Sequence, residues 1–398
     1  MPPVAVATRP SHVDDLLDHA CALVARFDES LLAELPSDVE IVDAHVHLGR
    51  DVDGMVADFD ELMAMLERYG NARAFAFCLD EEDRAPGFRA PNDRTLAYAE
   101  RSEGRVLPFV RLDLAEEPVA EAVRCLDRGA RGIKLHPRAQ AFVLADEQLA
   151  SVFALAAERR VPILIHGGHG LPPVADDLLY LVNAHPAVKL IVAHAGVADM
   201  ANLARRFAGV PGVYFDTSVW SPLDLLDLVR RVPPEQILYA SDYPYGQQPS
   251  SLLIARRVLS LVGAAEDDVR AVLGGNANRI ADGTPPLPPT IPKGPPTVTH
   301  LIVLARIHQY ISMAAPLLWR QRRDSVGVLD LAVAATAGDH ASAEVEQIGD
   351  LLRTARSLWQ AVPGLEDRAD RRTAARAVFQ LIQLADIIAV TTPCSRGG

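Results

Sequence analysis

The spacing of apolar residues changes along the chain, and each change predicts a different kind of structure. Residues 11–35 have apolar positions three and four apart, which predicts one or two helices before the first strand. From Ile41 onward, short apolar runs typical of buried parallel strands alternate with amphipathic stretches typical of helices. The predicted strands are 40–47, 73–79, 106–113, 132–137, 162–167, 189–195, 213–218 and 237–242, and the helices between and after them are 58–69, 118–128, 147–160, 174–184, 199–207, 222–231 and 250–262. This alternation predicts an α/β fold closed into a (β/α)8 TIM barrel, since no Gly-rich phosphate turn follows the first strand to favour an open doubly wound sheet.

A proline-rich segment marks a domain boundary after the barrel pattern. Residues 285–296 are dominated by proline, which favours extended polyproline II and makes a semi-rigid connector. Just before it, residues 275–278 (Gly-Asn-Ala-Asn) predict the cap at the start of a helix. Helical spacing resumes after the connector, so we expect a small bundle of helices. The predicted organisation is an N-terminal helical extension, a barrel, a linker and a C-terminal all-α helical domain, over residues 1–37, 38–282, 283–299 and 300–391.

The composition is that of an acidic globular protein. Apolar residues make up 49% and charged residues 23%, close to ordinary averages. The formal charge of -13 disfavours a nucleic-acid or anionic-membrane surface, so we expect a small-molecule substrate. No secretory signal opens the chain, and its best candidate for a membrane span, residues 301–318, is interrupted by polar residues. Together with four widely spaced cysteines that form no C-x-x-C motif, these features predict a cytoplasmic protein.

Polar side chains occupy the C-terminal ends of the predicted strands, which is where a barrel of this kind carries its chemistry. His45 and His47 are two residues apart on one strand, so both imidazoles point to the same side. A single histidine at a strand end is more often a hydrogen-bonded core residue. His45, His47, His166 and Asp242 taken together instead favour a divalent metal. The other polar residues at these ends are Arg111, Asp113, Lys134, His136, His194 and Asp216.

Six motifs resemble the amidohydrolase superfamily, and more narrowly its amidohydrolase-related (amidohydrolase 2) family of metal-dependent hydrolases and decarboxylases. They are Asp43-Ala-His-Val-His47, Gly132-Ile-Lys-Leu-His-Pro137, Ile165-His-Gly-Gly168, Ala193-His-Ala-Gly196, Ser241-Asp-Tyr-Pro244 and Gly275-Asn-Ala-Asn-Arg-Ile280. The resemblance covers about residues 38–282 and implies that the metal ligands are His45, His47, His166 and Asp242. It implies one divalent metal, Zn²⁺ first with Mn²⁺ or Fe²⁺ as alternatives, and a metal-activated water whose proton Asp242 accepts. His194 would polarise the substrate carbonyl or act as acid and base in the second step.

Four further residues keep two interpretations each. Lys134 is a substrate or structural contact beside a single metal, which we prefer, or a carboxylated ligand that bridges two metals. His136 is either a substrate contact or a hydrogen-bonded wall residue. His169 lies in a loop over the site or is simply a solvated loop histidine. Arg111 either pairs with Asp113 in a buried ion pair, the preferred interpretation, or holds a substrate carboxylate.

Three functions compete at this level. The first is a metal-dependent hydrolase acting on a small carbonyl substrate such as an amide, lactam, lactone or ester, favoured because residues 43–49 resemble the hydrolase-like members. The second is a non-oxidative metal-dependent decarboxylase of an aromatic or enoic carboxylate. The third is a non-catalytic barrel scaffold with the C-terminal helical domain as its interaction surface. We also expect that domain to build a homo-oligomer through its apolar stripe.

Overall fold

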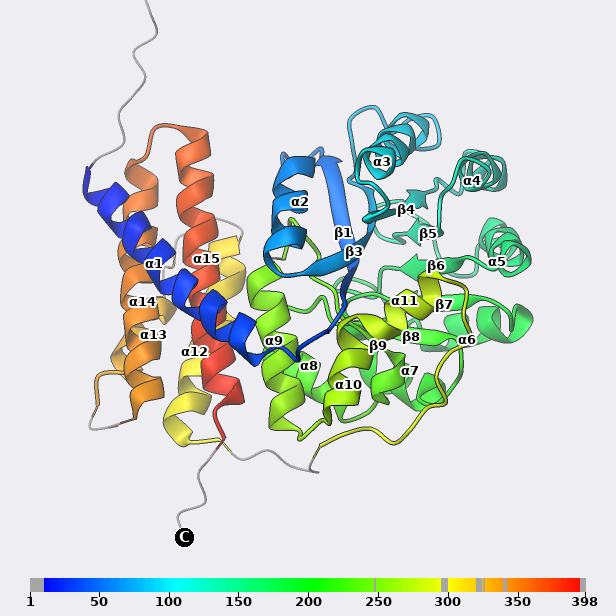
Figure 1. The fold of residues 1–398 in the computed structure, drawn as a ribbon. Coiled ribbons are helices and arrows are strands. Elements are labelled where there is room, and N and C mark those ends of the chain that lie inside the picture. Colours follow the sequence, from blue (N-terminus) through cyan, green and yellow to red (C-terminus); the bar gives the residue numbers. More distant parts are fainter. Residues whose placement is uncertain are drawn as a thin grey trace, which may run out of the picture. The chain divides into compact units, whose positions relative to one another are not determined.

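The structure is a computed structural model, and it describes residues 11–246, 248–294, 300–319, 324, 326–338 and 342–393. By its internal contacts the chain forms two compact units, which are described separately. One consists of Met1–Glu34, Ser221–Leu223 and Pro296–Gly398, and the other of Leu35–Trp220 and Asp224–Pro295. The second unit carries all the strands and the first is helical (Figure 1).

The barrel unit is built on one sheet with the strand order β2-β1-β3-β4-β5-β6-β7-β8-β9. Eight of these strands run parallel and correspond one for one to the predicted strands, while β2 pairs antiparallel with β1. The strands are β1 (Ile41–Arg50), β2 (Val56–Ala57), β3 (Asn71–Cys78), β4 (Val106–Arg111), β5 (Gly132–Leu135), β6 (Pro162–Ile165), β7 (Lys189–Val192), β8 (Val213–Asp216) and β9 (Ile237–Leu238). The predicted TIM-barrel-like α/β fold is therefore confirmed.

Backbone hydrogen bonds close the sheet on itself between β1 and the segment that follows β9. The Ala44 amide donates to the Tyr239 carbonyl at 2.9 Å, and the Asp242 amide donates to the His45 carbonyl at 2.9 Å. One residue pair further along, the His47 amide donates to the Tyr243 carbonyl at 2.7 Å. Closure leaves the parallel sheet without a free edge at this seam, and it brings the first and last strands to one point.

Helices cover the outside of the barrel (Figure 1). α2 begins at Asp58, whose side chain accepts hydrogen bonds from the amides of Asp60 and Glu61. α3 was not predicted, because its sequence is rich in polar residues and contains a proline. The helices are α2 (Phe59–Arg68), α3 (Arg89–Arg101), α4 (Pro118–Leu126), α5 (Glu147–Arg159), α6 (Ala175–Ala184), α7 (Met200–Phe207), α8 (Pro222–Val229), α9 (Gln248–Leu261), α10 (Glu266–Arg270) and α11 (Asn276–Ala281).

Large apolar side chains fill part of the barrel interior. The rings of Phe75 and Phe109 stack at a centroid distance of 4.9 Å. Other members of this buried cluster come from seven of the strands or the segments just after them and from α11, among them Val42, Leu164, Ile191, Tyr214, Leu238 and Ala277. The interior is a packed core and not a pore, so chemistry is confined to the ends of the strands.

The predicted helix start at residues 275–278 is wrong, because a helix already runs through these residues. A π-helical turn, Ala271–Gly275, joins α10 to α11, and Gly275 has helical dihedral angles. Asn276 is 2% exposed, and its Nδ2 donates to the carbonyls of Pro234 and Ile237 at 2.8 and 2.9 Å. The asparagine thus fixes the start of β9 instead of capping a helix.

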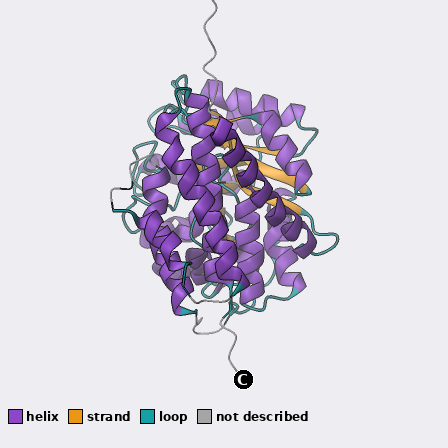
Figure 2. Ribbon diagram, turned by 90° about the vertical axis from the view of Figure 1, so that its left-hand side faces the viewer, coloured by secondary structure: helices purple, strands orange, loops and turns teal. Residues whose placement is uncertain are grey.

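The helical unit contains the N-terminal helix together with the C-terminal ones. α1 packs against α14 and α15, although more than 300 residues separate them in sequence. Figure 2 shows this group of helices side by side. Its members are α1 (Ser11–Glu34), α12 (Ile302–Trp319), α13 (Val328–Ala335), α14 (Ala343–Ala361) and α15 (Arg368–Thr391). Among the helices described, α15 alone has the length and apolar composition of a membrane span, but 72% of that stretch is buried inside the protein, as in the core helix of a bundle.

Replacing Gly274 with alanine should lower the free energy of unfolding of the barrel by about 2–3 kcal/mol. Gly274 lies in the π-helical turn, and a Cβ there would stand 1.8 Å from the Glu40 carbonyl oxygen, so the backbone must move. Urea unfolding followed by far-UV circular dichroism measures the change. Gly364→Ala is the control, because nothing lies within 4 Å of its Cβ. Equal midpoints for the two variants would contradict the close-packing argument.

Candidate metal centre

Three of the predicted metal ligands meet at one end of the barrel. Nε2 of His45 and Nε2 of His47 each lie 3.2 Å from Oδ1 of Asp242. All three residues are buried, and one ligand atom from each lies within 4.8 Å of the others. Such a cluster is a candidate site for a divalent ion, since it offers two imidazole nitrogens and a carboxylate oxygen.

The local backbone explains how Asp242 reaches the two histidines of β1. The carboxylate of Asp43 accepts the amides of His45 and Ser241, at 3.2 and 2.9 Å, and so ties β1 to the segment that carries Asp242. Asp242 has a φ of 60°, in the left-handed region. His194 shares this conformation, with a φ of 58°. A non-glycine residue held there costs about 1–3 kcal/mol, and such strain is concentrated at functional sites.

Asp216 holds the ring of His45 from the side opposite the cluster. Its Oδ2 lies 2.8 Å from Nδ1 of His45, and its Oδ1 accepts the amide of His194 at 2.8 Å. A carboxylate accepts hydrogen bonds, so Nδ1 of His45 carries the proton and Nε2 keeps its lone pair for a metal. Asp216 was placed at a strand end from the sequence but given no role. The amide of Ser218 also donates to Asp216. No sequence motif around Asp216 indicated that it orients the ring of His45.

His166 and His194 form a second chain of hydrogen bonds. Nδ1 of His194 lies 2.9 Å from the carbonyl oxygen of Ser218, and Nε2 of His194 lies 3.0 Å from Nδ1 of His166. Because a carbonyl can only accept, the proton of His194 sits on Nδ1, and His166 donates from its own Nδ1. Nε2 of His166 is then left as a free lone pair. Among the residues that the structure describes, two groups have the spacing of a metal site: His45, His47 and Asp242, and a second group of His45, His194 and Asp216. His166 belongs to neither group.

The loop after β6 brings its backbone close to these two imidazoles. A Cβ on Gly168 would lie 2.6 Å from Cε1 of His166 and 3.0 Å from Cδ2 of His194, so glycine is required for this approach. His169 follows on the same turn and is exposed. His136 is packed within the site, where its ring stacks on that of His166 at a centroid distance of 3.8 Å.

Lys134 is a buried cation beside the cluster. It is 1% exposed, its Nζ lies 3.3 Å from Nε2 of His45, and it stands 4.5 Å from the centre of the Phe77 ring. Burial lowers the pKa of Lys134 to about 7, against the opposing charges of Asp242 and Asp216. A lysine with a pKa near 7 fits either a substrate contact or a carboxylated ligand that bridges two metals. Both interpretations of Lys134 therefore remain predictions.

The electrostatics of the site suit metal ligation. Burial lowers the pKa of the imidazoles of His45, His47 and His194, and lowers that of His136 to about 2, so these rings are neutral lone-pair donors. Burial also raises the pKa of the Asp242 carboxyl well above its usual value. An ionised Asp242 therefore needs a cation beside it, and a divalent ion supplies that charge.

The predicted ion pair between Arg111 and Asp113 is wrong. Asp113 uses its carboxylate to accept the amide of Ala115 at 2.9 Å. Arg111 is 3% exposed and turns into the barrel, where Nη1 lies 3.4 Å from the carbonyl oxygen of Cys78. The two side chains leave the strand in different directions because Arg111 is the last residue of β4 and Asp113 already belongs to the loop.

The fold and this histidine–aspartate site define the class of protein. The chain belongs to the Amidohydrolase family (Amidohydro_2), whose profile matches residues 42–280. This span includes all the candidate site residues and excludes α1 and α12 to α15. No curated protein matches the chain in a sequence comparison.

Solved structures with a similar fold include hydrolases and decarboxylases. A probable 2-pyrone-4,6-dicarboxylic acid hydrolase from Acinetobacter baumannii has 12% identity and a TM-score of 0.48, with 61% of this chain and 99% of that one covered. A 2,6-dihydroxybenzoate decarboxylase from Rhizobium has 15% identity and a TM-score of 0.50, covering 61% and 99%. A dihydroxybenzoic acid decarboxylase from a Polaromonas species, solved with bound manganese, has 15% identity and a TM-score of 0.49, covering 61% and 97%. At these identities the likeness concerns the fold alone.

Replacing Asp216 with asparagine should weaken binding of a divalent metal about 10- to 100-fold, because His45 loses the carboxylate that orients its ring and fixes its proton. Titration of metal-free protein with Zn²⁺ against a chelating dye measures the affinity. Asp227→Asn is the matched control, since this half-exposed carboxylate pairs only with Arg231 on the barrel surface. Unchanged affinity in Asp216→Asn would show that the contact does not serve a metal site.

Proposed function

We propose that the protein is a metal-dependent hydrolase that uses a metal-activated water on a small carbonyl substrate such as an amide, lactam, lactone or ester. The observation that supports this most strongly is the convergence of His45, His47 and Asp242, with buried neutral imidazoles, at the end of the barrel. We assign the first three ligands to these residues. The fourth is His166, whose hydrogen bond to His194 leaves Nε2 available. Zn²⁺ suits this donor set best, and Mn²⁺ or Fe²⁺ would also fit.

When bound, such an ion supplies an acidified water and a Lewis acid for the substrate carbonyl. The chain's own residues move and hold the protons. Asp242 accepts the proton of the attacking water, because its carboxylate lies at the cluster, 3.2 Å from Nε2 of both His45 and His47. His194 lies beside His45, with 5.0 Å between the two ring centroids. We assign it as the later acid or as the group that polarises the carbonyl, a role for which its Nε2 must leave the contact with His166.

A non-oxidative decarboxylase is the second candidate. It is favoured by Lys134, a buried cation 3.3 Å from Nε2 of His45, where it can attract a reacting carboxylate. Release of carbon dioxide from a hydroxybenzoate would place the protein in this group instead. We further propose a cytoplasmic location and a homo-oligomer built through the helical unit. Light scattering tests the second point, and a monomer at micromolar concentration would exclude it.

Elemental analysis of the chain purified without added metal should find about one Zn, Mn or Fe per chain. His45→Ala should lose this metal and Lys134→Ala should retain it, because His45 is assigned as a ligand and Lys134 is not. Two metals per chain, one of them lost in Lys134→Ala, would mean a bridged binuclear centre. No metal after loading with Zn²⁺, Mn²⁺ and Fe²⁺ would leave a non-catalytic scaffold as the function.

Replacing Asp242 with asparagine should reduce kcat about 10²- to 10⁴-fold, because the amide cannot accept the proton of the attacking water. Turnover is measured on a panel of amides, lactones, esters and hydroxybenzoates, with the fold checked by circular dichroism. Asp113→Asn is the control, since Asp113 also follows a barrel strand but bonds only to the amide of Ala115. Substantial activity in Asp242→Asn would exclude the assigned role.

A further inference from the structure

Arg111 carries a buried positive charge that the protein does not neutralise. The side chain is 3% exposed, and its one hydrogen bond is the long contact from Nη1 to the Cys78 carbonyl. Among the residues that the structure describes, Nε and Nη2 have no hydrogen-bond partner and no acidic group pairs with the guanidinium. A buried ion without a partner is costly, so its presence calls for a ligand that supplies the missing charge.

The two unpartnered nitrogens form one edge of the guanidinium. Nε and Nη2 present parallel N–H groups, the arrangement that binds a carboxylate through both its oxygens. The same barrel shows this geometry satisfied at Arg124, whose Nε and Nη2 donate to the two carboxylate oxygens of Glu121, each at 2.7 Å. Arg111 offers the identical edge with the acceptor missing.

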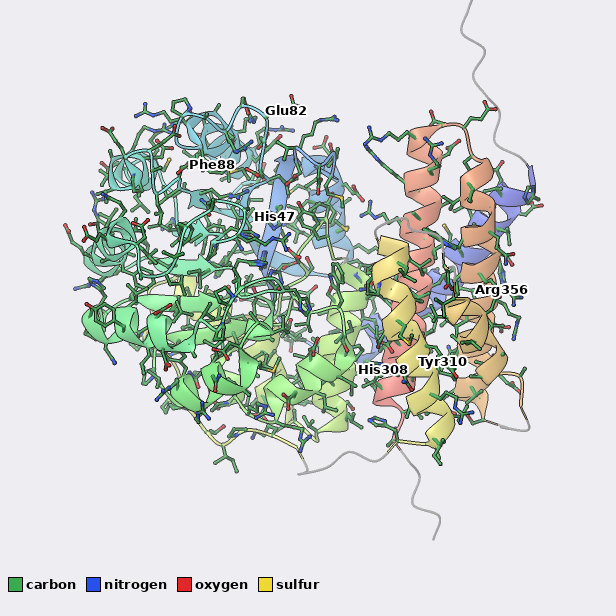
Figure 3. The ribbon with its side chains drawn as sticks, turned by 180° about the vertical axis from the view of Figure 1, so that it is seen from behind. His47, Glu82, Phe88, His308, Tyr310 and Arg356 are labelled. Carbon is green, nitrogen blue, oxygen red and sulfur yellow. The ribbon has the colours of Figure 1, made fainter. Side chains whose placement is uncertain are left out.

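Arg111 lies next to the candidate site. Arg111 is paired in register with Lys134 on the adjacent strand, and Lys134 reaches Nε2 of His45. The charge of Arg111 acts on both Lys134 and His47. Its guanidinium carbon lies 4.6 Å from the centre of the Phe88 ring, which covers one face. Figure 3 marks Phe88 and His47 in the barrel unit.

The position of Arg111 is fixed independently of any ligand. Asn92, which is fully buried, accepts the Arg111 amide through Oδ1 at 3.0 Å and donates through Nδ2 to the Arg111 carbonyl at 2.9 Å. Nδ2 of Asn92 also donates to Glu121, whose charge is already committed to Arg124. Asn92 thus holds the backbone of Arg111 in place, and Glu121, which shares Asn92 with it, is paired with Arg124. Such fixing before a ligand arrives is the preorganisation expected of a binding residue.

We propose that Arg111 binds a carboxylate of the substrate, so that the substrate is a small carbonyl compound carrying a carboxylate away from the bond that reacts. The carboxylate lies on the Nε and Nη2 edge of Arg111, against Phe88, and the reacting group faces His45, His47 and Asp242. This assignment rests on the proposed function for the chemistry at the reacting group. The binding of a carboxylate by Arg111 is independent of it and is measured without turnover.

The test compares the metal-loaded full chain with its Arg111→Met and Arg124→Met variants by thermal unfolding. Without ligand, Arg111→Met should unfold at the same temperature as the wild type or a higher one, because an uncompensated buried charge is removed. Arg124→Met should unfold at a lower temperature, because Glu121 loses its partner. Succinate, glutarate, benzoate and phthalate then serve as probes, each at constant ionic strength and beside its neutral amide. At least one carboxylate should stabilise the wild type, and its affinity should fall at least about ten-fold in Arg111→Met.

A carboxylate effect that is equal in the wild type and Arg111→Met, or absent from both, overturns the proposal. So does a ligand-free Arg111→Met that is destabilised as much as Arg124→Met, since that would show a structural role. His45→Ala separates this result from the proposed function. A carboxylate effect kept in His45→Ala and lost in Arg111→Met supports the assignment even if no metal or hydrolysis is found. The reverse pattern would place the carboxylate on the metal and overturn it.

Discussion

The closure of the barrel between β1 and the segment after β9 is the constraint on which the candidate site depends. The amide of Asp242 bonds to the carbonyl of His45, so the same backbone contact that seals the sheet also sets the carboxylate against the imidazole. Asp43 strengthens the seam from within by accepting amides from both sides. Without this closure, residues separated by almost 200 positions would have no reason to share a metal, and the left-handed conformation of Asp242 would have nothing to hold it.

The hydrogen bonds around the histidines determine which nitrogen of each ring can bind a metal. Asp216 and the Ser218 carbonyl accept hydrogen bonds from Nδ1 of His45 and of His194, and each contact decides which ring nitrogen keeps a lone pair. Burial keeps the rings neutral, so the lone pairs are available at ordinary pH. The ring nitrogens that keep a lone pair are therefore selected by residues outside the cluster of His45, His47 and Asp242.

The spacing of apolar residues along the sequence predicted most of the strands and helices of the fold. The strands are continuous apolar runs buried on both faces, and each of the eight parallel strands was predicted within a few residues of its observed position. α3 was missed because its helical face is largely polar, and residues 275–278 were misread because a π-helical turn has no local sequence signature. His45, His47 and Asp242 were recognisable from the strand ends. The predicted ion pair between Arg111 and Asp113 was wrong, because sequence spacing does not say in which direction two side chains leave a strand once it ends.

Charge compensation links the metal centre to the proposed carboxylate site. The cavity contains the buried acids Asp216 and Asp242 and the buried cations Arg111 and Lys134. A divalent ion at His45 and Asp242 adds two positive charges to this set, lowers the need for a protonated Lys134, and leaves the guanidinium of Arg111 without an opposing charge. An anionic substrate restores the balance where the protein itself does not. The unpaired edge of Arg111 and the buried carboxylate of Asp242 both fit a site that would hold a divalent cation and an organic anion side by side.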